Sequence, residues 1–153
     1  MIERSIFTPE HEMWRESVRR FVEQEIVPFH AAWEHDGIVP RELWLKAGEA
    51  GMLCCTVPEE YGGLGLDYLF DVIVYEELWK VGASGPGFLI HTDLVATYIL
   101  TAGTEEQKRQ WLPKMVMDRH NPFVLCLSRC NHRQPSRRAA LLQLLHDRAQ
   151  PIG

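Results

Sequence analysis

The sequence predicts an all-α protein: a helical bundle domain of about five helices, followed by a poorly structured or weakly helical C-terminal tail. Helix-start signals recur along the chain, apolar residues follow them at helical spacing, and glycines end the runs. The chain has 153 residues, of which 46% are hydrophobic, enough for one core-forming domain. Residues 1–118 hold 10 Lys and Arg against 20 Asp and Glu, whereas residues 119–153 hold 6 Arg and one acid. We therefore divide the chain into a helical domain, 1–118, and a basic tail of different composition, 119–153.

The first helix is expected to begin at Thr8, as N-cap, with Pro9 at the first helical position. Pro28 should bend or end it, and a short continuation with Trp33 facing inward should stop at Gly37. Apolar residues at helical spacing mark its predicted inner face: Met13, Trp14, Val18, Phe21, Val22 and Ile26.

The second helix is expected to begin at Pro40 and to end at Gly48 or Gly51. Residues 54–58 should then form a short extended piece. The predicted inner face of the helix carries Leu43, Trp44 and Ala47.

A glycine-rich turn is expected over residues 59–65. It has neither the G-x-G-x-x-G spacing of a dinucleotide site nor the Gly-Lys-Ser/Thr of a P-loop, so we read it as a connection between helices. Asp67 should cap the next helix, and Gly82 should end it. The helically spaced residues between them are Tyr68, Leu69, Val72, Ile73, Tyr75, Glu76 and Trp79.

The most apolar long stretch is residues 84–103, which Gly85-Pro86-Gly87 opens and Gly103 closes. We expect a central helix with the proline in its first turn, buried on nearly all sides. It is too short for a membrane span and carries His91 and Asp93. Alternatively, the Gly-Pro-Gly, His91 and Asp93 shape a pocket wall.

The last helix of the domain should begin with a capping box at residues 104–107 and bend at Pro113. Beyond residue 118 the succession of helix-start signals and helically spaced apolar residues weakens. Residues 123–127 could form one strand and residues 139–146 two turns of helix.

Composition also limits location and function. The cysteines are Cys54, Cys55, Cys126 and Cys130, and their spacing suggests no disulfide framework. The N-terminus resembles neither a secretory signal nor a transit peptide, so we expect a cytoplasmic protein. A net charge of −5 gives no reason to expect nucleic acid as a partner.

Six motifs, taken in order, resemble the N-terminal helical domain of the acyl-CoA dehydrogenases. They are TPEHEMWRESVRRFVEQEIVP, WLKAGEAGM, VPEEYGGLGLD, VYEELWKVG, SGPGFLIH and GTEEQKRQWLPKMV. The resemblance runs from Ser5 to Val116, and residues 84–91 look most like the long-chain branch. It implies an FAD-dependent flavoprotein of fatty acid β-oxidation that oxidises the Cα–Cβ bond of fatty acyl-CoA. In that family a glutamate removes the α-proton, the β-hydride passes to the flavin, and electrons leave to an electron-transferring flavoprotein.

The sequence departs from the family after Val116. The Ala-Met-Thr-Glu-Pro-type motif, the β-domain and the C-terminal bundle with the catalytic glutamate are absent. We therefore expect a truncated fragment with an out-of-frame or disordered tail, which neither retains FAD nor turns over alone. No catalytic, cofactor-binding or metal-binding residue is assigned; Glu76 and Glu77 match a structural helix of the family.

The resemblance does imply substrate contacts, because the helix matching residues 90–100 lines the deep end of the acyl-chain cavity in the family. An alkyl chain favours such an apolar wall. The alternative is that the segment is plain core. The residues implied for the acyl-tail cavity are Gly85, Pro86, Gly87, His91, Leu94 and Val95.

Two other functions are weighed. The chain could be a helical interaction module that docks on full-length relatives or, through the tail arginines Arg129, Arg133, Arg137 and Arg138, on acidic partners. A small zinc site could use Cys126, Cys130, His132 and His120, but no second Cys/His pair completes it. Apolar faces that pack on further domains in the family should leave Trp and Leu exposed here and favour self-association.

Overall fold

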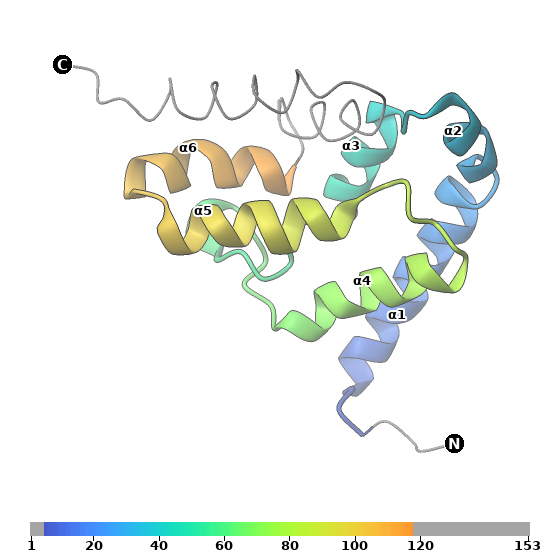
Figure 1. The fold of residues 1–153 in the computed structure, drawn as a ribbon. Coiled ribbons are helices and arrows are strands. Elements are labelled where there is room, and N and C mark those ends of the chain that lie inside the picture. The colour runs from blue at the N-terminus through green and yellow to red at the C-terminus, as the bar shows by residue number, and fades with distance from the viewer. Residues whose placement is uncertain (1–4, 118–153) are drawn as a thin grey trace. The chain divides into compact units, whose positions relative to one another are not determined.

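The computed structural model describes residues 5–117, and these form a helical bundle (Figure 1). This part of the chain contains six α-helices, two π-helical segments and one 3₁₀ turn, with no β-strand among the described residues, which confirms the all-α prediction. None of the described helices has the length and apolar character needed to cross a bilayer. The strand considered at 123–127, the helix at 139–146, the tail arginines and the zinc candidates lie outside the described residues.

The N-terminal arm consists of α1 (Pro9–Phe21), a π-helical segment η1 (Val22–Ile26) and α2 (His30–Asp36). Thr8 caps α1 as predicted, and its capping box is completed by the ring of His11, which accepts a hydrogen bond from the Thr8 backbone N–H at 3.0 Å. Gly37 ends α2 with φ of 69°, also as predicted. Met13 was placed wrongly on the inner face. Its side chain is 65% exposed, because the buried stripe of α1 runs through His11, Arg15 and Val18 instead.

α3 (Arg41–Glu49) follows, with Pro40 as its N-cap residue. Leu43, Trp44 and Ala47 are buried, as the spacing predicted. Further core residues come from α1, η1, α4 and α6, among them Val18, Ile26, Ile73, Leu112 and Met115, and from the segments 52–61 and 83–96.

The extended piece predicted at residues 54–58 is wrong, because the chain turns there. Cys54 has φ of 58°, a left-handed conformation that is unusual for a residue with a side chain. Two side chains distant in sequence stabilise the turn. The Asp71 carboxylate accepts from the backbone N–H of Cys55 and of Thr56 at 3.1 and 3.3 Å, and the Thr92 hydroxyl accepts from that of Cys54 at 3.2 Å.

A 3₁₀ turn η2 (Glu59–Tyr61) leads to α4 (Tyr68–Lys80), which packs against α1. Asp67 caps α4 by accepting from the Leu69 N–H at 2.8 Å, as predicted. The same carboxylate lies 3.1 Å from Nε2 of His11, so one imidazole joins the starts of α1 and α4. Gly82 follows the helix with φ of 70°.

The apolar stretch forms one helix from Phe88 to Ala102, made of a short α-turn, the π-helical segment η3 (Ile90–Ala96) and α5 (Thr97–Ala102). Pro86 lies in the turn before this helix, so its predicted place in the first helical turn is wrong. α6 (Glu105–Val116) packs back on α5 and η3. The predicted capping box between Thr104 and Gln107 starts α6, which continues through Pro113.

Candidate functional site

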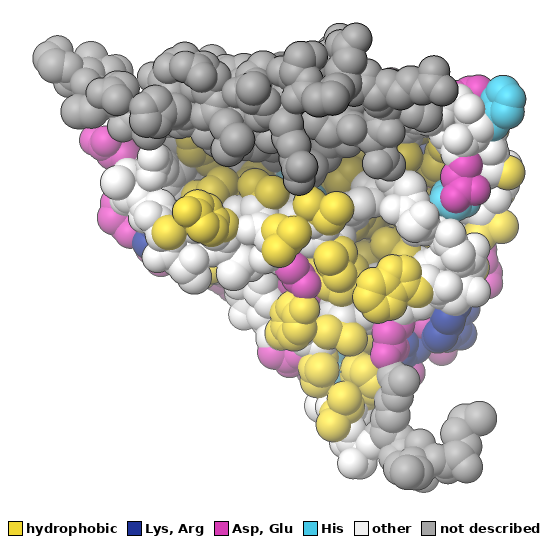
Figure 2. All heavy atoms as spheres, viewed as in Figure 1, with side chains coloured by type: hydrophobic (Ala, Val, Ile, Leu, Met, Phe, Trp, Pro, Cys, Tyr) yellow, Lys and Arg dark blue, Asp and Glu magenta, His cyan; other side chains and the backbone are white. Residues whose placement is uncertain are grey.

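The η3–α5 helix is not buried on nearly all sides, contrary to the prediction. Ile90, Leu94 and Tyr98 follow one another four residues apart and are 39, 60 and 73% exposed. Tyr68 of α4 is 53% exposed and reaches the same helix through Asp93. We call these four residues, Tyr68, Ile90, Leu94 and Tyr98, the outer face. Figure 2 shows hydrophobic side chains gathered over α4 and η3–α5.

The inner side of the same helix carries polar side chains. His91 and Thr92 are 1 and 2% exposed. The His91 ring donates from Nε2 to the Met115 carbonyl at 3.0 Å and lies edge-on to Trp44. Burial lowers the pKa of His91 to about 4, against the weaker opposing effect of the Met115 carbonyl, so the ring is neutral at pH 7. The helix thus buries satisfied polar groups together with Phe88 and Ala96, while large apolar side chains stay exposed on its outer side.

The π-helical segment η3 contains two of these exposed apolar residues, Ile90 and Leu94. π-helical turns inside α-helices are rare and occur frequently at functional sites. Here the seven-residue segment lets His91 and Thr92 reach α6 and the Cys54 turn, while Asp93 reaches α4. We therefore take the outer face as the candidate site.

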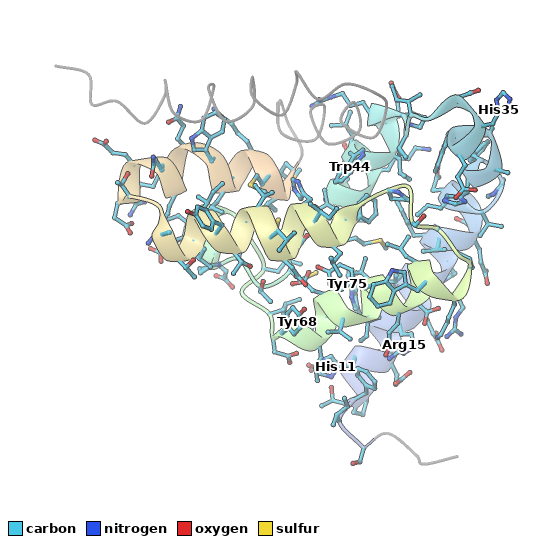
Figure 3. The ribbon with its side chains drawn as sticks, viewed as in Figure 1. His11, Arg15, His35, Trp44, Tyr68 and Tyr75 are labelled. Carbon is cyan, nitrogen blue, oxygen red and sulfur yellow. The ribbon has the colours of Figure 1, made fainter. Side chains whose placement is uncertain are left out.

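Asp93 joins the two helices of the outer face. Its carboxylate accepts hydrogen bonds from the hydroxyl of Tyr68 at 2.7 Å and from that of Tyr75 at 2.8 Å. Figure 3 labels both tyrosines along α4 below the η3–α5 helix. The hydrogen bond to Asp93, assisted by burial, raises the pKa of Tyr68 to about 12, and burial above all raises the pKa of Tyr75. Both hydroxyls therefore stay protonated donors at neutral pH.

The tyrosine pair was missed as part of a site, although Asp93 was considered as a pocket-wall residue. Tyr68 and Tyr75 were assigned only to the helical pattern of α4. Their separation of seven residues, two helical turns, puts them on one side of α4, and this spacing is the signal that could have found them.

The residues predicted for the acyl-tail cavity do not form one cluster. Leu94 is exposed and Val95 half-buried on the η3 segment, whereas His91 points into the core. The Gly85–Gly87 turn lies before the helix; a Cβ on Gly85 would lie 3.5 Å from the ring of His30 and 3.6 Å from Val39. Gly87 has φ of 66°, and Pro86 is buried.

Glu76 and Glu77 are held in ion pairs between α1 and α4. Arg15 donates to Glu76 at 2.7 Å and to Glu77 at 3.2 Å, and Glu77 also accepts from Arg19 at 3.1 Å and from Lys80 at 2.6 Å. Burial would raise the pKa of Glu77, but the hydrogen bonds from Lys80, Arg19 and Arg15 outweigh it and lower the pKa. This arrangement suits a structural clamp, because a general base needs a carboxylate that is accessible to substrate.

The described residues do not fit a flavin site. In the glycine-rich turn, the amides that could cradle a phosphate are used within the loop. Gly62, Gly63 and Gly65 donate to the carbonyls of Glu59, Pro58 and Val57. Two buried nitrogens in the described part, His30 Nε2 and Trp44 Nε1, have no hydrogen-bond partner, but two separate nitrogens do not make a pyrophosphate or isoalloxazine site. Residues 5–117 also hold no group of three or more His, Cys, Asp or Glu side chains able to bind a metal.

Comparison with known proteins identifies the family to which this fold belongs. The family model described as "Acyl-CoA dehydrogenase, N-terminal domain" matches residues 8–119. The chain belongs to the acyl-CoA dehydrogenase family. This confirms the resemblance drawn from the six motifs.

Individual relatives agree. The chain is 46% identical over 112 residues to the long-chain specific acyl-CoA dehydrogenase, mitochondrial, of Rattus norvegicus, covering 73% of this chain and 26% of that protein. It is similar to the crystal structure of acyl-CoA dehydrogenase from Geobacillus kaustophilus, with a TM-score of 0.72 and 47% identity over 75% of this chain and 30% of that one. It is also similar to glutaryl-CoA dehydrogenase from Mycobacterium smegmatis, with a TM-score of 0.66 and 33% identity over 74% of this chain and 30% of that one. The chain therefore matches about a quarter of the length of the curated relatives.

Proposed function

We propose that this chain is the N-terminal helical domain of an FAD-dependent acyl-CoA dehydrogenase that acts on fatty acyl-CoA. The reaction is α,β-dehydrogenation of the thioester in fatty acid β-oxidation, with electrons passed to an electron-transferring flavoprotein. The family match over residues 8–119 supports the reaction class, and the 46% identity to a long-chain specific enzyme favours a fatty acyl substrate.

One observation carries the part of this chain in that function. The η3–α5 helix satisfies its polar groups inside and exposes Ile90, Leu94 and Tyr98 outside. Exposed apolar surface of this kind marks a binding site or an interface. We assign the outer face, together with the half-buried Val95 next to it in the sequence, as one wall of the acyl cavity, with Leu94 and Val95 against the alkyl chain. Each methylene buried there contributes about 0.8 kcal/mol.

The remaining candidates take supporting roles in this proposal. His91 fixes the wall from behind by its hydrogen bond to the Met115 carbonyl. The Gly85–Gly87 turn leads into the helix that carries the wall, and its two glycines add no side chains there.

We further propose that the chain by itself neither retains FAD nor turns over. The glycine amides of residues 62–65 are occupied, and Glu76 and Glu77 are held by cations. The test is to purify the chain, record flavin absorbance with and without added FAD, and follow reduction of a dye with lauroyl-CoA. Colourless protein without dye reduction is expected. Protein that stays yellow, or that reduces the dye, contradicts the proposal.

A second function, docking on full-length relatives, is favoured by the exposed side chains of Trp79, at 64%, and Leu64, at 44%. Exposure of Trp and Leu was predicted and is confirmed; self-association remains a prediction. Incubation with the rat long-chain enzyme followed by size-exclusion chromatography tests docking. Co-elution is expected for an interaction module, and separate peaks exclude it.

The truncated origin of the chain, the 1–118 and 119–153 division and the cytoplasmic location remain predictions. The rat relative is described as mitochondrial. Fractionation of cells that express the chain tests its location; recovery in mitochondria would contradict the cytoplasmic prediction.

A further inference from the structure

A carboxylate without a cation lies beside the proposed acyl wall. Asp93 precedes Leu94 and Val95 on η3, and its two oxygens accept hydrogen bonds from the hydroxyls of Tyr68 and Tyr75. Within residues 5–117 these neutral donors are its side-chain partners, and it forms no ion pair there. An acidic side chain stands among the hydrophobic ones in the view of Figure 2.

The tyrosines hold this carboxylate in place. Tyr75 is 4% exposed and anchored in α4, and Tyr68 closes the cluster from the solvent side. With one bond to each oxygen, the carboxylate cannot rotate away from η3 without losing a hydrogen bond. Because the carboxylate is bonded directly to Tyr68 of the outer face, a methylene chain on that face meets a negative charge held in place beside it.

We propose that Asp93 is a specificity-determining residue that rejects acyl chains with a negatively charged far end and restricts the wall to uncharged fatty acyl groups. This inference rests on the proposed function, because it requires the outer face to contact the acyl tail. A second carboxylate brought to a partly dehydrated surface repels the first, and no nearby cation in the described part offsets the repulsion.

The fold alone does not impose this restriction. One similar structure is named glutaryl-CoA dehydrogenase, after an acyl group that ends in a carboxylate. Any restriction in this chain therefore depends on the side chains at the wall, and Asp93 is a charged side chain bonded to the outer face.

Three ligands of matched length test the inference on the full 153-residue chain by titration calorimetry. They are lauroyl-CoA, dodecanedioyl-CoA and the ω-methyl ester of dodecanedioyl-CoA, which keeps the length of the diacid without its charge. The unmodified chain is expected to bind lauroyl-CoA and the methyl ester with similar affinity and the diacid at least about tenfold more weakly. This comparison does not depend on the folding of any variant.

The Asp93→Asn variant should bring the diacid to within about threefold of the methyl ester, because the amide removes the charge but keeps an acceptor for one tyrosine. Asp36→Asn on α2 is the matched control, since it removes the same charge from an exposed site, and it should retain the full discrimination.

Equal binding of the diacid and its methyl ester by the unmodified chain overturns the inference. So does discrimination that persists in a folded Asp93→Asn variant. In both cases lauroyl-CoA still binds and the proposed acyl wall stands. Failure of all three ligands to bind overturns the acyl wall and this inference together.

Discussion

The neutral, buried ring of His91 makes the stability of the domain depend on pH in a defined window. In the unfolded chain a histidine titrates near its ordinary pKa of 6.5, whereas in the folded domain His91 stays neutral until about pH 4. The unfolded state therefore binds more protons between these values, and stability falls as the pH drops from 6.5 towards 4. The full difference of roughly 2.5 pKa values corresponds to about 3 kcal/mol.

Urea unfolding at pH 7 and pH 5 measures most of the loss in free energy of unfolding that comes from His91. Both pH values lie above the range in which ordinary carboxylates titrate. His91 should account for a loss of about 2 kcal/mol between the two conditions. His91→Gln keeps a donor for the Met115 carbonyl but does not titrate, so its loss should be smaller by that amount. His35→Gln is the control, because the His35 side chain is 89% exposed.

The result that refutes this reasoning is an equal pH dependence in the wild-type chain and His91→Gln, within about 0.5 kcal/mol. It would mean that the ring is hydrated or protonated in the folded domain, and that the inner side of η3 is not sealed.

Three further predictions concern the bundle. Glu77→Gln should cost about 2 kcal/mol in urea unfolding at pH 7, because buried Arg15 loses one of its carboxylates. The pKa of Glu77 is lowered in the folded domain, so this contribution should decline as the pH falls below the ordinary value of 4.5 and be lost only below the lowered pKa. Equal stability of the variant and the wild-type chain at pH 7 would contradict the clamp. Gly63→Ala should abolish cooperative unfolding or lower the free energy by more than about 3 kcal/mol, since its Cβ would lie 1.9 Å from a backbone carbonyl oxygen; a native-like melting curve would contradict this. In a variant with Cys126 and Cys130 replaced by serine, the buried thiols of Cys54 and Cys55 should react with Ellman's reagent only on unfolding, because burial raises the pKa of both thiols. Rapid reaction of the folded chain would contradict this.

Local signals predicted much of the bundle. Thr8, Asp67 and Thr104 cap helices as expected, because an N-cap acts on amides two or three residues away. Gly37 and Gly82 follow helices with positive φ for the same local reason.

Features that depend on distant partners were not predictable in this way. The turn at Cys54 is set by Asp71 and Thr92, 16 and 38 residues beyond their partners. The buried side of the η3–α5 helix was also misjudged. Apolar residues on all sides suggested full burial, but contacts of His91 and Thr92 with other segments decide which side turns inward.

The candidate site was predicted only in part. The resemblance pointed to Leu94 and Val95, which lie on the helix that carries the outer face, and Asp93 was considered for the wall. The role of Tyr68 and Tyr75 depends on how α4 lies against η3, which no local pattern specifies.

The most direct test of the central claim, that the outer face contacts an acyl chain, is calorimetric titration of the full chain with lauroyl-CoA. The wild-type chain and Leu94→Lys are compared, with Thr101→Lys as a control at an exposed position of α5. We predict saturable binding that Leu94→Lys weakens by about tenfold or more and that Thr101→Lys leaves unchanged. No saturable binding by the wild-type chain, or equal binding by Leu94→Lys, would contradict the claim.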